Sequence, residues 1–336
     1  MVLITGATGH LGNVLVRELN RKGEQVRVLV HPKDNLISLQ MLPLEIAYSD
    51  INDDFSTALK GVECVFHLAS LISITPGKKR LVYKTNVGGT LNVIRLCKKF
   101  KIPLVYVSSV HALAEVAKGS VITENIPVDE NQVKGDYAKS KAIATKEVMK
   151  AFKEGLEGYI IFPTGICGPF DYKLSHFSRV LLKYKEKKLK IAVEGKFDFV
   201  DVRDVVKALV SLYEILKAKH YPVNHQSYIV SGNDIHFELL PIICGLEDYK
   251  VLRKFSSNLI SYLSLVASSV LGIRTEFLPY ALHIIRLDYK YCCNKLRETI
   301  EYHPKKFEKS VHDFFDWFYN NSIDNNKSTT YQKFEE

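Results

Sequence analysis

The sequence predicts an α/β fold in which a doubly wound parallel sheet carries a smaller, mostly helical C-terminal lobe. Short apolar runs alternate with amphipathic segments of helical period through the first half of the chain. The runs are rich in Val and Leu and apolar on both faces, as strands are when helices cover both sides of a parallel sheet. Three glycines also follow the first run directly, at the turn into the first amphipathic segment.

The apolar runs are expected to be strands because each is short and bounded by polar or turn-forming residues. In chain order they are 1–5 (MVLIT), 25–30 (QVRVLV), 44–50 (LEIAYSD), 64–70 (CVFHLAS), 104–109 (LVYVSS), 158–163 (GYIIFP) and 227–232 (SYIVSG). Helices are expected at 11–23 and 85–101 between the early strands. A last amphipathic helix is expected at 305–321, where Phe, Val and Trp share one stripe.

The composition is that of an ordinary globular protein, with 46% hydrophobic and 25% charged residues among 336. This length suits one large domain or two coupled domains that bury a core without disulfides. The six cysteines follow no metal-binding spacing, so we expect reduced thiols in a cytoplasmic protein and no metal site. No signal peptide is expected ahead of the first strand. The net charge of +9 comes from dispersed bases, which favours a solvated surface over nucleic-acid binding.

Gly6, Gly9 and Gly12, in the stretch TGATGHLG, lie between the first strand and the first helix. Glycine at such a turn lets the backbone approach a pyrophosphate closely, and the helix N-terminus favours the negative charge. The spacing is GxxGxxG, one residue wider at the first gap than the common dinucleotide-binding fingerprint. Its position at the first strand–helix turn predicts a phosphate loop.

The end of the second strand bears on the choice of cofactor. An acid there binds the ribose 2′-hydroxyl of NAD, whereas a base accommodates the 2′-phosphate of NADP. The strand is followed by His31 and Lys33, and Asp34 comes too far past its end to be expected on the ribose. NADP is therefore favoured over NAD.

The pattern changes after about residue 165, where loops lengthen and aromatic residues become denser. We expect residues 1–165 and 196–232 to form the dinucleotide-binding domain, and 166–195 and 233–320 to form a substrate-binding lobe. The tail 321–336 is rich in Asn, Ser, Thr and Lys and is expected to be disordered. The uncharged run 255–273 approaches the length of a membrane span, but its serines favour a packed or interfacial helix.

Tyr137 and Lys141 lie four residues apart in the helical stretch GDYAKSKAIA, so both side chains are expected on one face. A phenol has a pKa of about 10, and a neighbouring ammonium is expected to lower that pKa toward the range useful for proton transfer. The strand 104–109 ends in a serine pair, and parallel strands place functional groups at their C-terminal ends. Ser109, in preference to Ser108, is expected to hydrogen-bond the same substrate oxygen as Tyr137.

These features together resemble the extended branch of the short-chain dehydrogenase/reductase superfamily, in particular its dihydroflavonol reductase and 3β-hydroxysteroid dehydrogenase-like group. The resemblance extends over about residues 1–235 and implies a Rossmann-type sheet. It is carried by motifs in the family's order, namely TGATGHLG, YSDI (48–51), HLAS (67–70), TNVGGT (85–90), SS (108–109), YAKSK (137–141), FPTGICGPFD (162–171) and FVDVRDV (199–205).

The resemblance implies that Tyr137 is the general acid/base, that Lys141 holds the nicotinamide ribose, and that Ser109 orients and polarises the carbonyl or carbinol. The hydride chemistry itself belongs to the cofactor. Cofactor contacts are implied at Gly6, Thr8, Gly9, His10, Leu11, Gly12, His31, Lys33, Asp50, Ile51, Leu68, Ala69, Ser70, Asn86, Val107, Ser108, Tyr137, Lys141, Pro163, Thr164, Gly165 and Ile166. Two residues depart from the family's pattern: Phe162 and His31 stand where its reductases often have Arg.

The implied activity is the NAD(P)-dependent interconversion of a secondary alcohol and a ketone on a medium-sized, largely apolar small molecule, such as a steroid- or flavonoid-like compound. The segment after Ser109 lacks the Asp-Glu pair of the dehydratases and the Tyr-Gly of the epimerases. A nucleotide-sugar epimerase is one alternative, and a non-catalytic dinucleotide sensor is another. The family also suggests a homodimer formed through two sheet-covering helices, one of which carries Tyr137.

Three further polar residues have expected roles outside the chemistry. Asp204 is expected to cap the N-terminus of a helix that follows FVDVR. His67 and His111 lie near strand ends, and both are expected to be polar lining residues, not catalysts.

Overall fold

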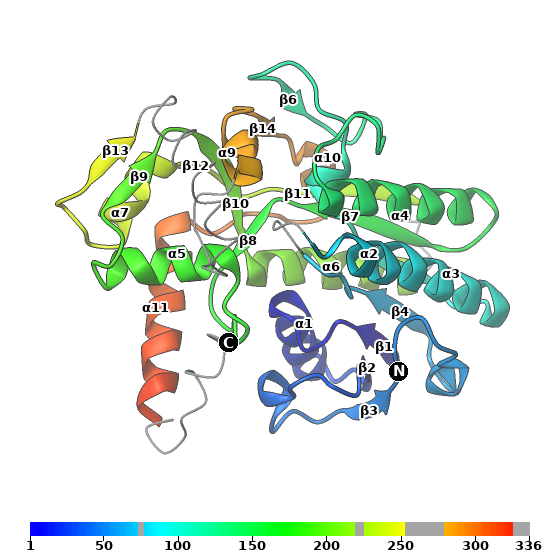
Figure 1. Ribbon diagram of the computed structural model, residues 1–336. Helices are drawn as coiled ribbons and strands as arrows, with labels where there is room; N and C mark the ends of the chain where they lie inside the picture. The colour runs from blue at the N-terminus through cyan, green and yellow to red at the C-terminus, as the bar shows by residue number, and fades with distance from the viewer. Residues whose placement is uncertain (73–76, 219–224, 253–278, 325–336) are drawn as a thin grey trace.

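The structure, a computed structural model, describes residues 1–72, 77–218, 225–252 and 279–324. Its centre is a seven-stranded sheet of order β11-β7-β5-β4-β1-β2-β3, in which every neighbouring pair runs parallel (Figure 1). The strands are β1 Val2–Thr5, β2 Val26–Val30, β3 Glu45–Tyr48, β4 Cys64–His67, β5 Leu104–Val107, β7 Gly158–Pro163 and β11 Gln226–Val230. The predicted doubly wound parallel sheet is therefore confirmed.

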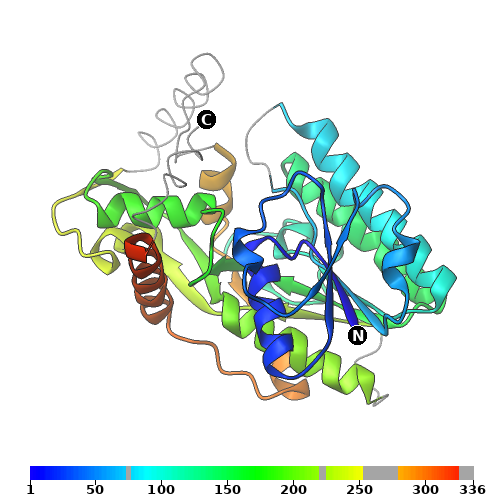
Figure 2. The same ribbon diagram turned by 90° about the horizontal axis from the view of Figure 1, so that it is seen from below.

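Helices cover both faces of this sheet (Figures 1 and 2). The main ones are α1 His10–Arg21 and α6 Val202–Lys217 on one face, and α3 Gly89–Phe100 and α4 Asp136–Lys153 on the other. Alternate residues of β1 face the two layers, because Val2 and Ile4 are buried with α1 and α6 while Leu3 is buried with α3 and α4. This is why the strands are apolar on both faces.

The strand order reverses at β1, whose neighbours are β2 on one side and β4 on the other. In open α/β sheets the crevice beyond the carboxyl ends of the strands at such a reversal is where ligands bind. The edge strand β3 departs from the expected burial, since Ile46 is 40% and Tyr48 58% exposed. β3 is the edge strand of the sheet, and these two side chains remain exposed to solvent.

The helix expected at 85–101 is divided. A short helix, α2 (Lys79–Tyr83), leads into a π-helical turn at Lys84–Gly88, and α3 begins only at Gly89. Single π-turns of this kind often occur at functional sites. Here the turn carries Asn86, one of the predicted cofactor contacts.

The C-terminal lobe is built on a three-stranded sheet of order β12-β10-β8. Its strands are β8 Gly165–Cys167, β10 Lys196–Asp201 and β12 Asn233–His236, joined by the pairs β9 Ile191–Val193 with β13 Lys250–Leu252 and β6 Val121–Ile122 with β14 Lys290–Tyr291. Its helices are α5 His176–Lys185, α7 Leu240–Ile243, α9 Pro279–Ile285, α10 Asn294–Thr299 and α11 Phe307–Asp324. β8 follows β7 after one residue, so the two sheets meet where the sequence pattern changes.

Two predicted segments fall wholly or largely outside the described residues: the uncharged run 255–273 and the tail 321–336. The first residues of that tail, up to Asp324, continue α11. Within the ranges that the structure describes, no helix combines the length and the apolar character that crossing a membrane requires.

The expected cap at Asp204 is wrong. Asp201 occupies the N-cap of α6 and its carboxylate accepts a hydrogen bond from the backbone N–H of Arg203. Asp204 lies one turn further on, where its carboxylate binds the backbone N–H of Lys305 at 2.6 Å and the Lys305 ammonium at 2.7 Å. It therefore ties the segment before α11 to α6.

Candidate active site

The glycine loop has no room for side chains at two of its three glycines. Gly6 has a φ of +74°, and a Cβ there would lie 2.6 Å from the backbone nitrogen of Ala69. A Cβ on Gly12 would lie 2.2 Å from the carbonyl oxygen of Gly6. The loop is closed by a hydrogen bond from the Gly9 N–H to that same oxygen, at 3.0 Å. The turn therefore requires glycine for its conformation and for the close approach of β4.

The N-terminus of α1 offers its backbone donors to the crevice. The N-cap is Gly9, no side chain caps the helix, and no acidic residue lies in its first turn. The first N–H groups of a helix lack intrahelical partners and attract anions. Thr8, His10 and Leu11 line this turn, so the donor set fits the pyrophosphate of a dinucleotide.

A second segment closes over this loop, which the sequence did not lead us to expect. The Thr8 hydroxyl donates to Asp34 at 2.8 Å and accepts from the Lys173 ammonium at 3.0 Å. His10 Nε2 lies 2.9 Å from the carbonyl oxygen of Pro169. Asp34 thus reaches the glycine loop, and the expectation that it does not bind the ribose stays a prediction. Lys173 stands just after the motif FPTGICGPFD, and no spacing rule points to it.

The ends of β2 and β3 lie side by side, with His31 Nε2 3.9 Å from a carboxylate oxygen of Asp50. Hydrogen bonds from Asn52 lower the pKa of Asp50. Ile51 packs against Gly89, where an added Cβ would lie 2.7 Å from its side chain. His31 and Lys33 are both exposed. These residues form one end of the crevice.

Asn86 organises the segment that follows β4. Its amide oxygen accepts from the Leu71 N–H at 2.7 Å and from the Ser70 hydroxyl at 3.2 Å. Its amide nitrogen donates to the Leu71 carbonyl at 3.1 Å and to the Ser140 hydroxyl at 2.9 Å. The Ser140 hydroxyl in turn donates to the carbonyl of Tyr137. One buried side chain therefore links the loop of Leu68, Ala69 and Ser70 to α4.

The two serines that follow β5 have different neighbours. The Ser108 hydroxyl lies 2.6 Å from that of Thr145 and is buried between β5 and α4. Ser109 is the residue whose hydroxyl reaches Tyr137, together with Ser70. The expectation that Ser109, in preference to Ser108, bonds the substrate oxygen stays a prediction. Val107 contributes its carbonyl, which accepts from the Lys141 ammonium at 2.7 Å.

Tyr137 and Lys141 lie on α4 as expected, but the electrostatics differ from the expectation. Burial raises the pKa of Tyr137 to about 12, and hydrogen bonds from Ser109 and Ser70 act in the opposite direction. Burial also lowers the pKa of Lys141 to about 7, so its ammonium is a weak source of charge near neutrality. The prediction that Lys141 makes this phenol acidic is therefore wrong for the protein alone. Tyr137 is instead a protonated donor at neutral pH.

The four residues expected beside the nicotinamide, Pro163, Thr164, Gly165 and Ile166, span the junction of β7 and β8. The Thr164 hydroxyl donates to Asp198 at 2.6 Å, and its N–H donates to the Val230 carbonyl. Burial raises the pKa of that Asp198 carboxyl to about 6. The Thr164 hydroxyl is thus engaged inside the lobe.

The two histidines differ. His67 is fully buried, and its ring nitrogens lie 2.7 Å from the Thr5 hydroxyl and 2.9 Å from the Thr90 hydroxyl. Burial lowers its pKa to about 3, so it is a neutral core residue, not a lining one. His111 does line the site: its ring centroid lies 6.3 Å from that of Tyr137.

Beyond His111 lies a cavity of about 190 Å³ with mostly aromatic and aliphatic walls. Its wall includes Phe177, Phe197, Phe199, Phe237 and Tyr280. Phe177 and Phe199 stack with centroids 4.0 Å apart. Such a cavity suits an apolar molecule, and His111 in its wall lies next to the Tyr137 ring. This combination suits proton transfer to or from a substrate oxygen.

Comparisons with known proteins agree with this arrangement. The model of the 3-beta hydroxysteroid dehydrogenase/isomerase family matches residues 3–238. The chain is 32% identical over 248 residues to sterol demethylase protein B of Methylococcus capsulatus, covering 73% of each protein. It is 29% identical over 250 residues to a putative dihydroflavonol 4-reductase of Synechocystis sp., covering 72% of each. The crystal structure of gox2253 superposes with a TM-score of 0.80 at 26% identity, covering 96% of this chain and 98% of that one.

Proposed function

This chain belongs to the 3-beta hydroxysteroid dehydrogenase/isomerase family, and from that premise we propose that it is a nicotinamide-dependent oxidoreductase. It interconverts a secondary alcohol and a ketone on a medium-sized, largely apolar substrate of sterol- or flavonoid-like shape. The observation that carries the proposal is the position of the Tyr137 hydroxyl, which lies with Ser109 and Ser70 at the carboxyl edge of the sheet.

Each residue of the site has a stated task. Tyr137 donates its proton to the carbonyl oxygen in the reduction and accepts it in the oxidation. Ser109 hydrogen-bonds the same oxygen and fixes its position. Lys141 keeps two further N–H donors beyond the one used on Val107, and these suit the hydroxyls of a ribose. The bound nicotinamide supplies the hydride chemistry.

The raised pKa of Tyr137 fits this task in the direction of reduction. A phenol that stays protonated at neutral pH is ready to donate, and burial strengthens its hydrogen bonds to a substrate oxygen. In the oxidation direction the same site needs the phenolate. A cation close to the hydroxyl favours that form. The Lys141 ammonium contributes there in its charged state.

The proposal includes NADP as the favoured cofactor. His31 and Lys33 place two bases at the exposed end of β2. Asp34, the acid that competes with this assignment, is engaged by the Thr8 hydroxyl and lies 3.6 Å from the Lys173 ammonium. That ammonium neutralises the carboxylate and leaves the surroundings suited to a 2′-phosphate. Measuring kcat/KM with NADPH and with NADH decides the assignment.

The proposal also extends to a homodimer formed through the helices on the Tyr137 side of the sheet. Leu91 and Phe100 on α3 are each 43% exposed, so apolar side chains are available on the helix next to α4. Light scattering of the purified protein tests this. A monomeric mass at micromolar concentration contradicts it.

The test of the function is a turnover screen that follows the absorbance of NADPH and NADH. Sterol, flavonoid-like, aldehyde and nucleotide-sugar panels are offered to the wild-type enzyme and to Tyr137→Phe. We expect turnover with sterol- or flavonoid-like ketones and alcohols and its loss in the variant. Conversion of a nucleotide sugar with no net change in the added cofactor identifies an epimerase instead. Binding of the dinucleotide with no turnover on any panel supports a sensor.

A further inference from the structure

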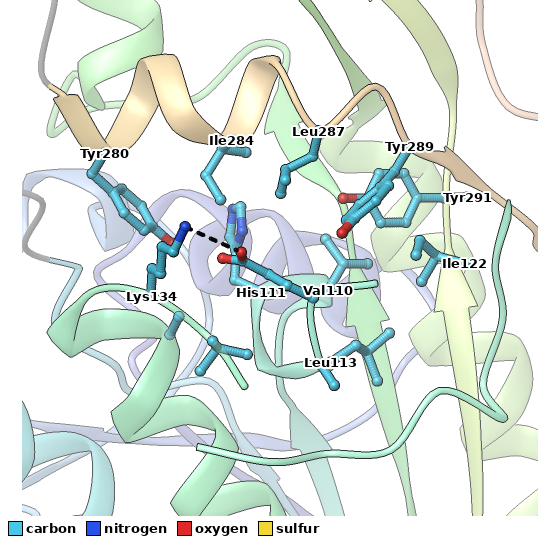
Figure 3. Close-up of a pocket in the computed structure, with 14 residues that line it drawn as sticks. Val110, His111, Leu113, Ile122, Lys134, Tyr280, Ile284, Leu287, Tyr289 and Tyr291 are labelled. Atoms are coloured by element: carbon cyan, nitrogen blue, oxygen red, sulfur yellow. Dashed lines mark ion pairs between the residues drawn. The ribbon is translucent and has the colours of Figure 1, made fainter. Parts of the chain in front are cut away.

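Two cavities meet at the rings of His111 and Tyr280, which line both of them. The larger one, of about 190 Å³, is the aromatic cavity described above. The smaller one, of about 20 Å³, lies between α9 and the segment that follows β5 (Figure 3). That volume holds one group of about the size of a water molecule. We call this smaller cavity the polar pocket.

The Tyr280 side chain extends from α9 toward the polar pocket (Figure 3). Its ring lies directly against Gly135, where an added Cβ would be 2.8 Å from the ring carbon Cε2. The Tyr280 hydroxyl oxygen is buried and has no hydrogen-bond partner among the described residues. A buried hydroxyl without a partner is costly, so a ligand group that pairs with it gains affinity.

His111 presents the second polar group. Its ring stacks flat on Phe197, with centroids 5.5 Å apart and an interplanar angle of 2°. The Tyr280 ring centroid is 6.2 Å away. Burial lowers the pKa of His111 to about 4, so the imidazole is neutral and offers one donor and one acceptor. Within the described part of the chain, the ring contacts aromatic neighbours and no hydrogen bond occupies its nitrogens.

The charged groups around the polar pocket pair with one another. Glu115 contributes a carboxylate to its wall and is held by His283 Nε2 at 2.9 Å and by Lys134 at 3.8 Å. Burial, with Tyr137 and Glu115 as further causes, raises the pKa of Tyr280, so its hydroxyl remains a donor. The Lys134 ammonium is already paired with Glu115, and the pocket has space for one small group.

We propose that the polar pocket is a subsite for a single uncharged oxygen of the substrate, a hydroxyl or keto group close to the reacting carbon, bound by Tyr280 and His111. The apolar body of the substrate occupies the aromatic cavity on the other side of the same two rings. Tyr280 and His111 are then the specificity-determining residues of the site. The inference rests on the proposed oxidoreductase function and names the substrate class in more detail.

The test uses three matched 3β-hydroxysterols that carry hydrogen, a hydroxymethyl group or a carboxylate on the carbon next to the carbinol. Oxidation is followed by the absorbance of the reduced dinucleotide. We expect the wild type to prefer the hydroxymethyl sterol over the unsubstituted one by about tenfold in kcat/KM, as one buried hydrogen bond allows. Tyr280→Phe is expected to abolish this preference, because the hydroxyl that pairs with the added oxygen is removed.

Two further variants separate binding from folding. His111→Phe keeps the stack on Phe197 and is expected to reduce the same preference. Tyr289→Phe is the matched control, because Tyr289 lines the same pocket but its hydroxyl already donates to the Val116 carbonyl at 2.7 Å. This control is expected to leave the preference among the three sterols unchanged.

The inference is overturned if the wild type turns over the unsubstituted and hydroxymethyl sterols equally, if the carboxylate is the best substrate, or if Tyr280→Phe keeps the preference. In each of these cases the oxidoreductase function stands. Absence of turnover with all three sterols contradicts the proposed sterol substrate itself, and the subsite is rejected with it.

Discussion

The two walls of the cleft are built in different ways. On the cofactor wall, made by the glycine loop, Asn86 and Lys141, polar groups are bonded to one another and to the backbone. On the pocket wall, made by His111, Phe197 and Tyr280, rings pack against rings. Of the residues described there, Tyr280 keeps a buried hydroxyl that no neighbour satisfies.

We infer from this difference that the cofactor wall has a fixed geometry, whereas the pocket wall selects among substrates. A polar network whose members are already paired holds its geometry before any ligand arrives, so the cofactor wall can serve any substrate of the same chemistry. Unpaired polar groups among apolar rings gain a partner only from the right ligand. We therefore expect specificity to reside in the pocket wall, and the two walls to respond differently to substitution.

The largest effect is expected for Gly12→Ala on the cofactor wall. The new Cβ would overlap the Gly6 carbonyl at 2.2 Å, so the loop must shift. We expect dinucleotide affinity to fall by about 100-fold or more, since the backbone donors of the loop lose their positions. Titration of the dinucleotide against protein fluorescence measures this. Gly155→Ala is the control for backbone strain alone: its φ is +96° but no atom lies within 4 Å of the added Cβ, so it is expected to bind the dinucleotide normally.

Lys141→Met is expected to lower turnover by about 10- to 100-fold, because the ammonium proposed to hold the ribose is lost. It also changes the pH dependence of stability. The pKa of Lys141 is about 7 in the folded protein, and the unfolded chain binds its proton up to about pH 10.5. The wild type therefore gains stability as the pH rises from 7 to 10, and the variant lacks this gain. If urea titrations show the same change in the free energy of unfolding across that pH range for the wild type and the variant, Lys141 is not a buried, neutral lysine.

Asp198→Asn tests the junction between the sheet and the lobe. Burial raises the pKa of Asp198 from 3.8 to about 6, so the folded protein holds this proton over a range where the unfolded chain has lost it. The contribution of the Asp198 carboxyl to the free energy of unfolding is therefore fully present below about pH 4, and it is lost as the pH rises through 6. Relative to the wild type, Asn is expected to gain roughly 3 kcal/mol between pH 4 and pH 7.5. Asp316→Asn on the exposed side of α11 is the control, with no such gain.

The smallest effect is expected for His31→Asp at the rim of the cofactor wall. An acid at this exposed position repels a 2′-phosphate and accepts from a 2′-hydroxyl. We expect the ratio of kcat/KM for NADPH over NADH to fall by about three- to tenfold, as one partly screened charge allows. An unchanged ratio means that residues other than His31 discriminate between NADPH and NADH. Lys33 and Lys173 are then the next candidates.

The cofactor wall was largely predictable from the sequence, and the pocket wall was not. Gly6 and Gly12 are constrained by backbone geometry, and the i, i+4 spacing of Tyr137 and Lys141 places both on one face of a helix. Lys173 and Tyr280 come from distant segments, and only the folded chain brings them to the site. The mistaken acidity of Tyr137 has the same origin, because spacing shows a neighbouring lysine but not the burial that raises one pKa and lowers the other.

The central claim is that the Tyr137 hydroxyl transfers the proton between the protein and the substrate oxygen. The direct test is the single-turnover rate of Tyr137→Phe with dinucleotide bound, compared with Tyr319→Phe on α11, which lies far from α4 in Figures 1 and 2. We predict a rate lowered by about 10²- to 10⁴-fold in Tyr137→Phe, with unchanged dinucleotide affinity, and a normal rate in Tyr319→Phe. A Tyr137→Phe protein that retains most of the wild-type rate contradicts the claim.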